Sequence, residues 1–148
     1  RTVTKMLLRS ADLSTLLVDT GLAEPDLVDP ATLGDLAGAA VHEVVRLESV
    51  AEHVAASGVE AAGFADALAG ELERRTRPAV AVKSIIAYRD GLTVPAERPS
   101  AADVRRAADG WLRGTPSGGR LTDPVLLRHV LWAGEKRTAR RACDGDGR

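Results

Sequence analysis

The sequence is poor in cysteine and in aromatic residues. Its single cysteine, Cys143, excludes a disulfide framework, and only 3% of the 148 residues are aromatic, so a core must be built mainly from Ala, Val and Leu. No apolar run approaches the roughly 20 residues that a membrane-spanning helix needs. The start, RTVTKMLLRS, also lacks the apolar region of a signal peptide. We therefore expect a cytoplasmic protein that does not associate with a membrane.

The sequence has no strong excess of charge of either sign. Its formal net charge is -1 and its sequence pI is near 6.4, which argues against a surface that binds a polyanion. Near the C-terminal end Arg137, Arg140 and Arg141 form a basic group, but Asp144 and Asp146 offset it. We therefore expect no nucleic-acid partner.

Common catalytic and nucleotide-binding motifs are also missing. The sequence contains no G-x-S-x-G, no P-loop and no G-x-G-x-x-G. The histidines His42, His53 and His129 are scattered, and no two have the spacing of metal ligands. A functional site must therefore be inferred from where residues fall in the fold.

Short apolar runs are present and are typical of buried strands. They read STLLV (14–18), VHEVVRL (41–47) and AVAV (79–82). Continuous rather than alternating runs indicate parallel strands that are buried on both faces. Helical patterns alternate with the runs, and strand followed by helix, repeated three times, predicts parallel strands with crossover helices.

Capping signals predict where the helices begin and end. A helix is expected to end at Ser10, another to run from Pro30, with Asp29 as its N-cap, to Gly38, and a short one to reach Ala56. Pairs with the spacing of a capping box, or Asp before Pro, mark three further starts: Ser57 with Glu60 for a helix to Thr76, Ser100 with Asp103, and Asp123 with Pro124. The stretch 115–119 is expected to be a loop.

An ionisable residue follows each predicted strand. Asp19 follows LLV, Glu48 follows VVRL, and Lys83 follows AVAV, with Tyr88 and Arg89 a few residues later. In parallel α/β proteins ligands bind at the carboxyl ends of the strands. Cations placed there must be solvated, paired or offered to an anion. Spacing alone leaves a functional site and ordinary solvated strand ends equally open.

The character of the sequence changes at Gly134. The segment GEKRTARRACDGDGR has no helical apolar periodicity and no aliphatic residue larger than Ala. This predicts one domain at 1–133 and a disordered tail at 134–148. The abrupt change would fit a truncated or frameshifted product, and Arg1 in place of Met indicates that the natural start is missing.

Several blocks of the sequence resemble a known family. They are LLVDTGL (16–22), VHEVVRLE (41–48), VKSIIAYRDGL (82–92) and LTDPVLLRHVLW (121–132). They resemble consecutive blocks of the amidohydrolase-related TIM-barrel family, in the group that includes the N-terminal domain of fungal fluG-like proteins. The pattern K-S-I-x-x-Y-R-x-G-L is the most specific part, and the resemblance covers roughly residues 4 to 133.

The resemblance implies a fold class and an activity. A complete (β/α)₈ barrel takes about 250 residues, so this chain would be an α/β fragment of one, with about three parallel strands and their crossover helices. The implied activity is metal-dependent hydrolysis of an amide or similar C–N bond by a metal-bound water. The isolated fragment is expected to be inactive.

The resemblance also implies a cofactor and roles for the strand-end residues. A divalent metal, zinc in the first place, is expected in the complete barrel. The family's His-x-His pair and its later His and Asp have no counterpart here, so no metal is expected for this chain alone. The implied substrate is a small molecule with a carboxylate or amide. The residues expected to bind it, directly or in support, are Lys83, Arg89, Tyr88, Arg46, Glu48 and Asp19. Among these, Arg46 and Glu48 would form a supporting pair, and Asp19 would orient a cation. Carboxylation of Lys83 to bridge two metals ranks lower.

Two other functions remain open. The chain could be a small non-enzymatic α/β module in which Lys83 and Arg89 bind an anionic or carboxylate metabolite. It could instead complete a barrel with another chain, because an open set of parallel strands leaves unpaired edges that favour association.

Overall fold

The computed structural model describes residues 2–21, 27–115 and 119–144, with side chains as far as Glu135. One sheet contains the strands β1 (Thr15–Asp19), β2 (Ala40–Arg46) and β3 (Ala81–Lys83). The strands lie in chain order, and both neighbouring pairs are parallel. The predicted α/β arrangement of three parallel strands is therefore confirmed.

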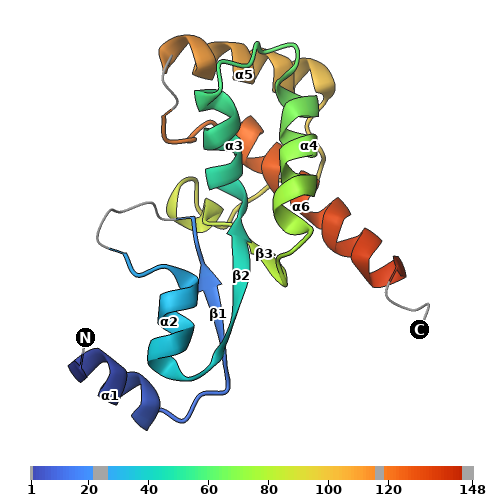
Figure 1. Ribbon diagram of the computed structural model, residues 1–148. Coiled ribbons are helices and arrows are strands. Elements are labelled where there is room, and N and C mark those ends of the chain that lie inside the picture. Colours follow the sequence, from blue (N-terminus) through green and yellow to red (C-terminus); the bar gives the residue numbers. More distant parts are fainter. Residues whose placement is uncertain (1, 22–26, 116–118, 145–148) are drawn as a thin grey trace.

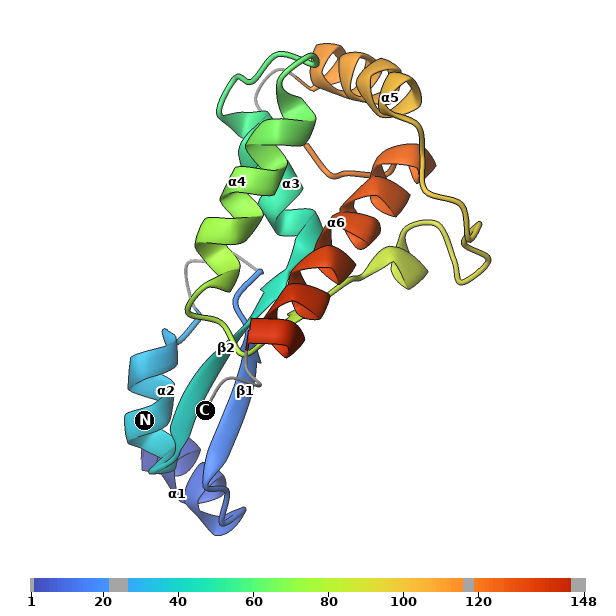
Figure 2. The ribbon, with the colours of Figure 1, turned by 90° about the vertical axis from the view of Figure 1, so that its right-hand side faces the viewer.

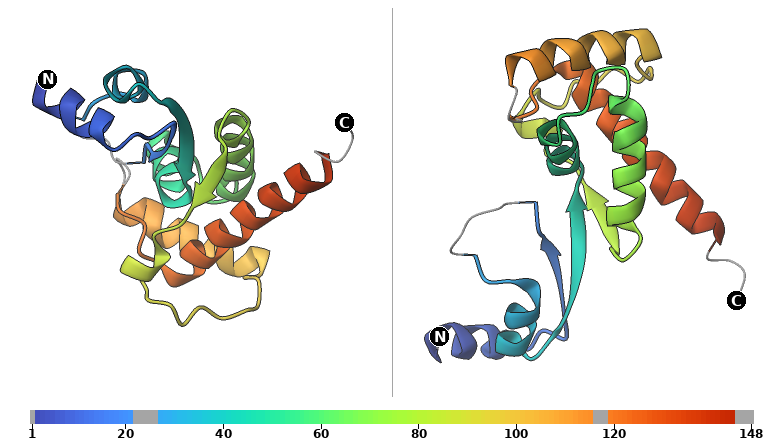
Figure 3. Two further views of the ribbon diagram at one scale, coloured as in Figure 1. Left: turned by 90° about the horizontal axis from the view of Figure 1, so that it is seen from below. Right: turned by 45° about the horizontal axis from the view of Figure 1, so that its top comes forward.

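Helices precede, connect and follow the strands (Figure 1). They are α1 (Thr2–Ser10) before β1, α2 (Pro30–Ala37) between β1 and β2, α3 (Leu47–Ala56) and α4 (Phe64–Thr76) between β2 and β3, and the 3₁₀ helix η1 (Ile86–Tyr88), α5 (Ala101–Gly114) and α6 (Pro124–Asp144) after β3. Helix α3 continues onward from the end of β2, and α4 returns beside it toward β3 (Figure 2). The helices α3, α4 and α5 thus gather beyond the carboxyl ends of the strands, and α6 begins there and runs back past β3 (Figure 3). The helices α1 and α2 lie near the opposite end (Figure 3).

The hydrophobic core lies mainly among these four helices. Its largest fully buried apolar side chains come from α4, α6, α3 and β2, with one from the segment before α6: Phe64, Leu68, Leu72, Leu126, Leu127, Val130, Val50, Val45 and Leu121. Phe64 meets the ring of Trp111 edge-on, with 5.8 Å between ring centroids. As expected from the composition, the core is mainly aliphatic. Among the described helices, none has the length and apolarity needed to cross a membrane.

The two faces of the sheet differ in burial. Val45 of β2 is 1% exposed and belongs to the core, so its face of the sheet is covered. On the other face Leu17 of β1 is 62% exposed, and His42 and Ala81 are also exposed. The prediction that the strands are buried on both faces is therefore wrong, because helices of the described chain cover one face only.

Most predicted helix ends are confirmed by their caps. Asp29 Oδ1 accepts a hydrogen bond from the Thr32 N–H at 2.9 Å, and Gly38 ends α2 in the left-handed conformation at φ 71°. Ser100 Oγ accepts from the Asp103 N–H at 3.1 Å at the start of α5. Asp123 Oδ1 likewise accepts from the first backbone N–H groups of α6.

The predicted capping box at Ser57 and Glu60 is wrong. Ser57 Oγ donates to the Val54 carbonyl at 2.7 Å and so completes the end of α3. Helix α4 begins only at Phe64, after Gly63, whose lack of a side chain leaves no capping hydrogen bond. The residues between the two helices form turns instead.

The predicted disordered tail begins inside a helix, since α6 continues to Asp144. Gly134 is buried against α3, where a Cβ would lie 2.6 Å from Leu47 Cδ1. The residues that follow are rich in Ala, Arg, Lys and Glu, which favour helix even without an apolar stripe. The division into a domain at 1–133 and a tail stays a prediction, but its boundary falls within α6. Residues 116–118 of the predicted loop lie outside the described ranges.

Candidate functional site

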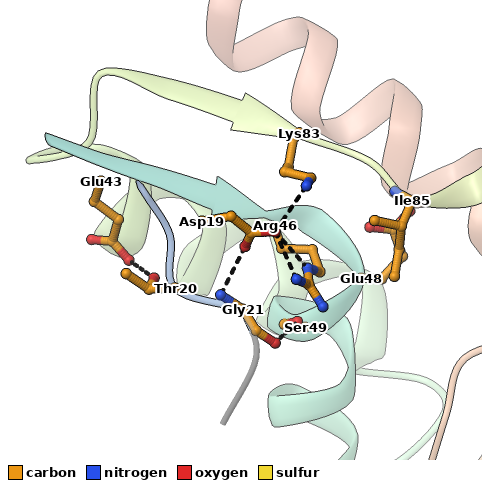
Figure 4. Close-up of polar contacts among 9 residues, drawn as sticks. All are labelled: Asp19, Thr20, Gly21, Glu43, Arg46, Glu48, Ser49, Lys83 and Ile85. Carbon is orange, nitrogen blue, oxygen red and sulfur yellow. Dashed lines mark hydrogen bonds and ion pairs between the residues drawn. The ribbon is translucent and has the colours of Figure 1, made fainter. Parts of the chain in front are cut away.

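Charged residues from the ends of all three strands meet on one face of the sheet (Figure 4). Arg46 and Lys83 are register partners, and Asp19 is the partner of Val44. Side chains alternate between faces along a strand, so Asp19, Arg46 and Lys83 all project from the face opposite Val45. We call these three residues the strand-end cluster.

The cluster is built around a single carboxylate oxygen. Asp19 Oδ2 accepts from Arg46 Nε at 3.0 Å and Nη2 at 2.6 Å, and Lys83 Nζ lies 3.0 Å from the same oxygen. Arg46 and Asp19 are mostly buried, whereas the Lys83 side chain is 44% exposed. Two cations share one carboxylate, so the cluster carries an excess of one positive charge.

The contacts of Asp19 keep it ionised. Its burial raises the pKa, but the hydrogen bonds from Arg46, from the Gly21 N–H and from Lys83 together outweigh burial and hold the pKa below its ordinary value of 3.8. Asp19 is therefore a negative centre in contact with both cations. Its predicted role, to orient a cation for a ligand, stays a prediction.

Gly21 packs closely against the cluster. Its N–H donates to Asp19 Oδ1 at 2.8 Å, and its carbonyl accepts from Ser49 Oγ at 2.8 Å. A Cβ at this position would lie 2.5 Å from Arg46 Cβ and 2.8 Å from both Arg46 Nε and Ser49 Oγ. Only glycine lets the chain leave β1 this close to Arg46.

Both cations retain donors that no described residue occupies. Within the described residues no hydrogen bond occupies Arg46 Nη1, and the exposed Lys83 ammonium has further N–H groups. An excess positive charge with donors of this kind suits a carboxylate or another small anion.

The remaining predicted site residues lie elsewhere. The prediction that Glu48 pairs with Arg46 is wrong: Glu48 is 1% exposed and its Oε1 accepts from the Ser84 hydroxyl and, at 3.0 Å, from the Ile85 N–H. The chain changes from strand to helix at Leu47, so strand alternation no longer fixes where Glu48 points. Arg46 is instead engaged by Asp19.

Arg89 and Tyr88 are not part of the strand-end cluster. Arg89 Nη1 donates to Glu52 Oε1 at 2.5 Å and to the Leu121 carbonyl at 2.8 Å, and its side chain is only 6% exposed. The Leu121 N–H donates to the same Glu52 oxygen at 2.8 Å. Arg89 thus joins η1 to α3 and to the segment before α6, whereas Tyr88 is 84% exposed. Substrate binding by either residue stays a prediction.

Comparisons with known proteins give a likeness of fold. No family model and no curated protein matches the chain. The structure is similar to the crystal structure of a protein described as a "putative metal-dependent hydrolase" from Lactobacillus casei ATCC 334, with a TM-score of 0.76 and 26% sequence identity. The match covers 88% of this chain and 34% of that chain, so this chain spans about a third of the length of the Lactobacillus casei protein. The likeness concerns the fold of this segment.

The strand-end cluster does not fit a metal ion, and the described part of the chain offers no other set of ligands. Among the described residues no group of three or more His, Cys, Asp or Glu side chains is arranged to hold one. In the strand-end cluster both Asp19 oxygens already accept hydrogen bonds, and two adjacent cations would repel a divalent ion. The cluster therefore suits an anion rather than a metal.

Sequence reasoning missed Gly21 and Ser49 as parts of the site. The signal for Gly21 was available, because D-T-G after an apolar run places a glycine two residues after a strand-end aspartate. No local pattern points to Ser49, which reaches Gly21 from α3 across 28 residues of sequence.

Proposed function

We propose that this chain is a segment of an amidohydrolase-type (β/α)₈ barrel, and that Arg46 and Lys83 bind the carboxylate of a small substrate with an amide or similar C–N bond. The observation that carries the proposal is the sharing of Asp19 Oδ2 by two cations at the carboxyl ends of parallel strands. Ligands of parallel α/β barrels bind at that end. The fold likeness to the Lactobacillus casei protein supports the hydrolase class.

A carboxylate suits the cluster on physical grounds. One further negative charge would balance the cluster, and Arg46 is already oriented by its two hydrogen bonds to Asp19. The guanidinium therefore loses little freedom when a ligand binds, which lowers the entropic cost of recognition. Lys83, being more exposed, supplies the second contact.

Other parts of the barrel would supply the metal chemistry in this proposal. A divalent metal, zinc in the first place, provides an activated water in hydrolases of this kind. This chain contributes recognition of the substrate anion and the three strands that carry it. Among the described residues β1 and β3 each pair on one side only, so their free edges are where further barrel strands or a partner chain would associate.

Acetate binding tests the anion site. The ¹⁵N-labelled chain is titrated with sodium acetate and followed by amide NMR shifts, with tetramethylammonium chloride as the control for ionic strength. We expect saturable shifts in β3 and at Gly21, and about tenfold weaker binding in Lys83→Ala and in Arg46→Ala, the loss typical of one charge-assisted hydrogen bond. Lys5→Ala is the matched control, because Lys5 is an exposed lysine on α1, outside the cluster.

The titration has clear contrary outcomes. Shifts that do not saturate, or that persist unchanged in Lys83→Ala, would rule out the strand-end cluster as a carboxylate site. The non-enzymatic alternative, an α/β module that binds an anionic metabolite, is favoured by the two cations of the strand-end cluster, which suit an anion rather than a metal. It predicts the same acetate binding but no hydrolysis in any assembly. The deciding assay is hydrolysis of an N-acyl amino acid by this chain assembled with the other strands and helices of a complete barrel. Hydrolysis that is lost in Lys83→Ala would decide for the hydrolase.

A further inference from the structure

A buried carboxylate next to the strand-end cluster touches neither of its cations. Glu48 lies in the first turn of α3, two residues after Arg46, where a negative charge is favoured by the helix dipole. Its Oε2 is buried and has no hydrogen-bond partner among the described residues. The hydrogen bonds described for this carboxylate therefore all pass through Oε1.

Those hydrogen bonds hold the turn that follows Lys83. The ladder between β2 and β3 ends at the pair Arg46 and Lys83. Directly beyond it, Glu48 Oε1 accepts from the Ser84 hydroxyl and the Ile85 N–H, and Ser84 Oγ in turn accepts from the Ile86 N–H at 3.1 Å. The Glu48 carboxylate thus accepts a backbone hydrogen bond where the β2–β3 ladder has ended. In this way it fixes the backbone on the C-terminal side of Lys83.

We propose that Glu48 is a positioning residue for Lys83, an inference that rests on the proposed anion site. Glu48 contacts no ligand. Through Ser84 and Ile85, Glu48 fixes the position of the Lys83 backbone. From that position Lys83 Nζ reaches Asp19 Oδ2 at 3.0 Å and keeps its remaining N–H donors for the ligand. Because Glu48 itself follows Arg46 by two residues, it ties the two cations into one rigid unit.

The same helix offers a matched control. Glu52 stands one turn after Glu48 on α3, and its Oε1 also accepts one backbone N–H, from Leu121, and one side-chain donor, from Arg89. Replacing Glu52 also removes two contacts, one of them an ion pair with buried Arg89, but leaves the turn after Lys83 intact. A general loosening of α3 would therefore affect both variants alike, whereas positioning of Lys83 depends on Glu48 alone.

The test uses two readouts. The first is the rate at which an N-hydroxysuccinimide ester acylates Lys83 relative to the exposed Lys5, measured by mass spectrometry without ligand; the second is the acetate affinity. We expect Glu48→Ala to raise the Lys83 to Lys5 rate ratio about fivefold and to weaken acetate binding by a similar factor, as loss of one modest hydrogen-bonded contact does. We expect Glu52→Ala to change neither. Glu48→Gln, which keeps an Oε1 acceptor, should restore both values nearly to those of the wild type. Thermal unfolding confirms that each variant is folded.

The outcomes separate this inference from the proposed function. An unchanged rate ratio in a folded Glu48→Ala, equal changes in Glu52→Ala, or failure of Glu48→Gln to restore the ratio would each overturn the positioning role. If Glu48→Ala fails to fold, Ser84→Ala, which removes one of the two contacts, decides by the same ratio. If the wild type binds no acetate while the rate ratios change as expected, the proposed anion site fails and the control of Lys83 by Glu48 stands.

Discussion

Replacing Gly21 by alanine should loosen the strand-end cluster by a purely steric effect. The new methyl group would lie 2.5 Å from Arg46 Cβ and 2.8 Å from Ser49 Oγ, and neither neighbour can withdraw easily. Arg46 Cβ is fixed to the backbone of β2, and Ser49 Oγ donates to the Gly21 carbonyl. Overpacking of this kind costs about 1–3 kcal/mol. Reduced freedom of the unfolded chain returns about 0.4–1 kcal/mol, which leaves a net destabilisation of about 1–2 kcal/mol.

Urea unfolding measures the change in the free energy of unfolding, and a second glycine provides the control. In thermal unfolding, the same net loss corresponds to a fall in Tm of about 2–8 °C for a chain of this size. Gly70 lies inside α4 with no atom within 4 Å of a Cβ, so Gly70→Ala should instead stabilise the protein by up to about 1 kcal/mol, the difference in helix propensity. We also expect Gly21→Ala to weaken acetate binding, because Arg46 must move away from Asp19. A Gly21→Ala variant as stable as the wild type would refute the close packing described here.

Two further predictions concern pH and helix capping. Asp19 has a lowered pKa in the folded state, so it stabilises the protein above its ordinary pKa of 3.8, and this contribution is lost as the pH falls through the lowered value. The difference in free energy of unfolding between the wild type and Asp19→Asn should therefore be constant from about pH 5 to 7 and shrink as the pH falls below the ordinary pKa, as urea unfolding at a series of pH values would show. A difference that does not shrink at all below the ordinary pKa would contradict it. Ser100→Ala should cost about 1 kcal/mol, because it removes the cap of α5, whereas Ser57→Ala should change stability by about 0.5 kcal/mol or less. Equal losses in thermal unfolding of the two serine variants would argue against the capping assignment.

Local signals in the sequence predicted most of the secondary structure. A cap depends on residues within one turn of each other, so Asp29, Ser100 and Asp123 mark helix starts without knowledge of the rest of the fold. The same reasoning failed at Ser57, because its hydroxyl can also bond to the turn that precedes it. The burial of the strands was overestimated, because a run of apolar residues does not show whether other elements will cover both faces of the sheet.

The candidate site was predictable only in part. Strand ends in a parallel sheet share one edge, and this rule brought Asp19 and Lys83 together correctly. The partner of Arg46 could not be predicted, since Asp19 and Glu48 are both carboxylates and only the switch from strand to helix at Leu47 decides between them. The contact of Arg89 with Glu52 and Leu121 joins segments 37 and 32 residues apart, which no local pattern encodes.

The side chains of Asp19, Arg46 and Lys83 lie on the same face of the sheet. The cluster therefore depends on whether an insertion or deletion within a strand has an odd or an even number of residues. One residue inserted in β2 ahead of Arg46 would turn its side chain toward the helix-covered face, and a second insertion would turn it back. The turns between α3 and α4 lie outside the sheet, so length changes there leave this parity untouched. Natural variation in the length of such segments should therefore accumulate between the helices, while the strands keep their count of residues.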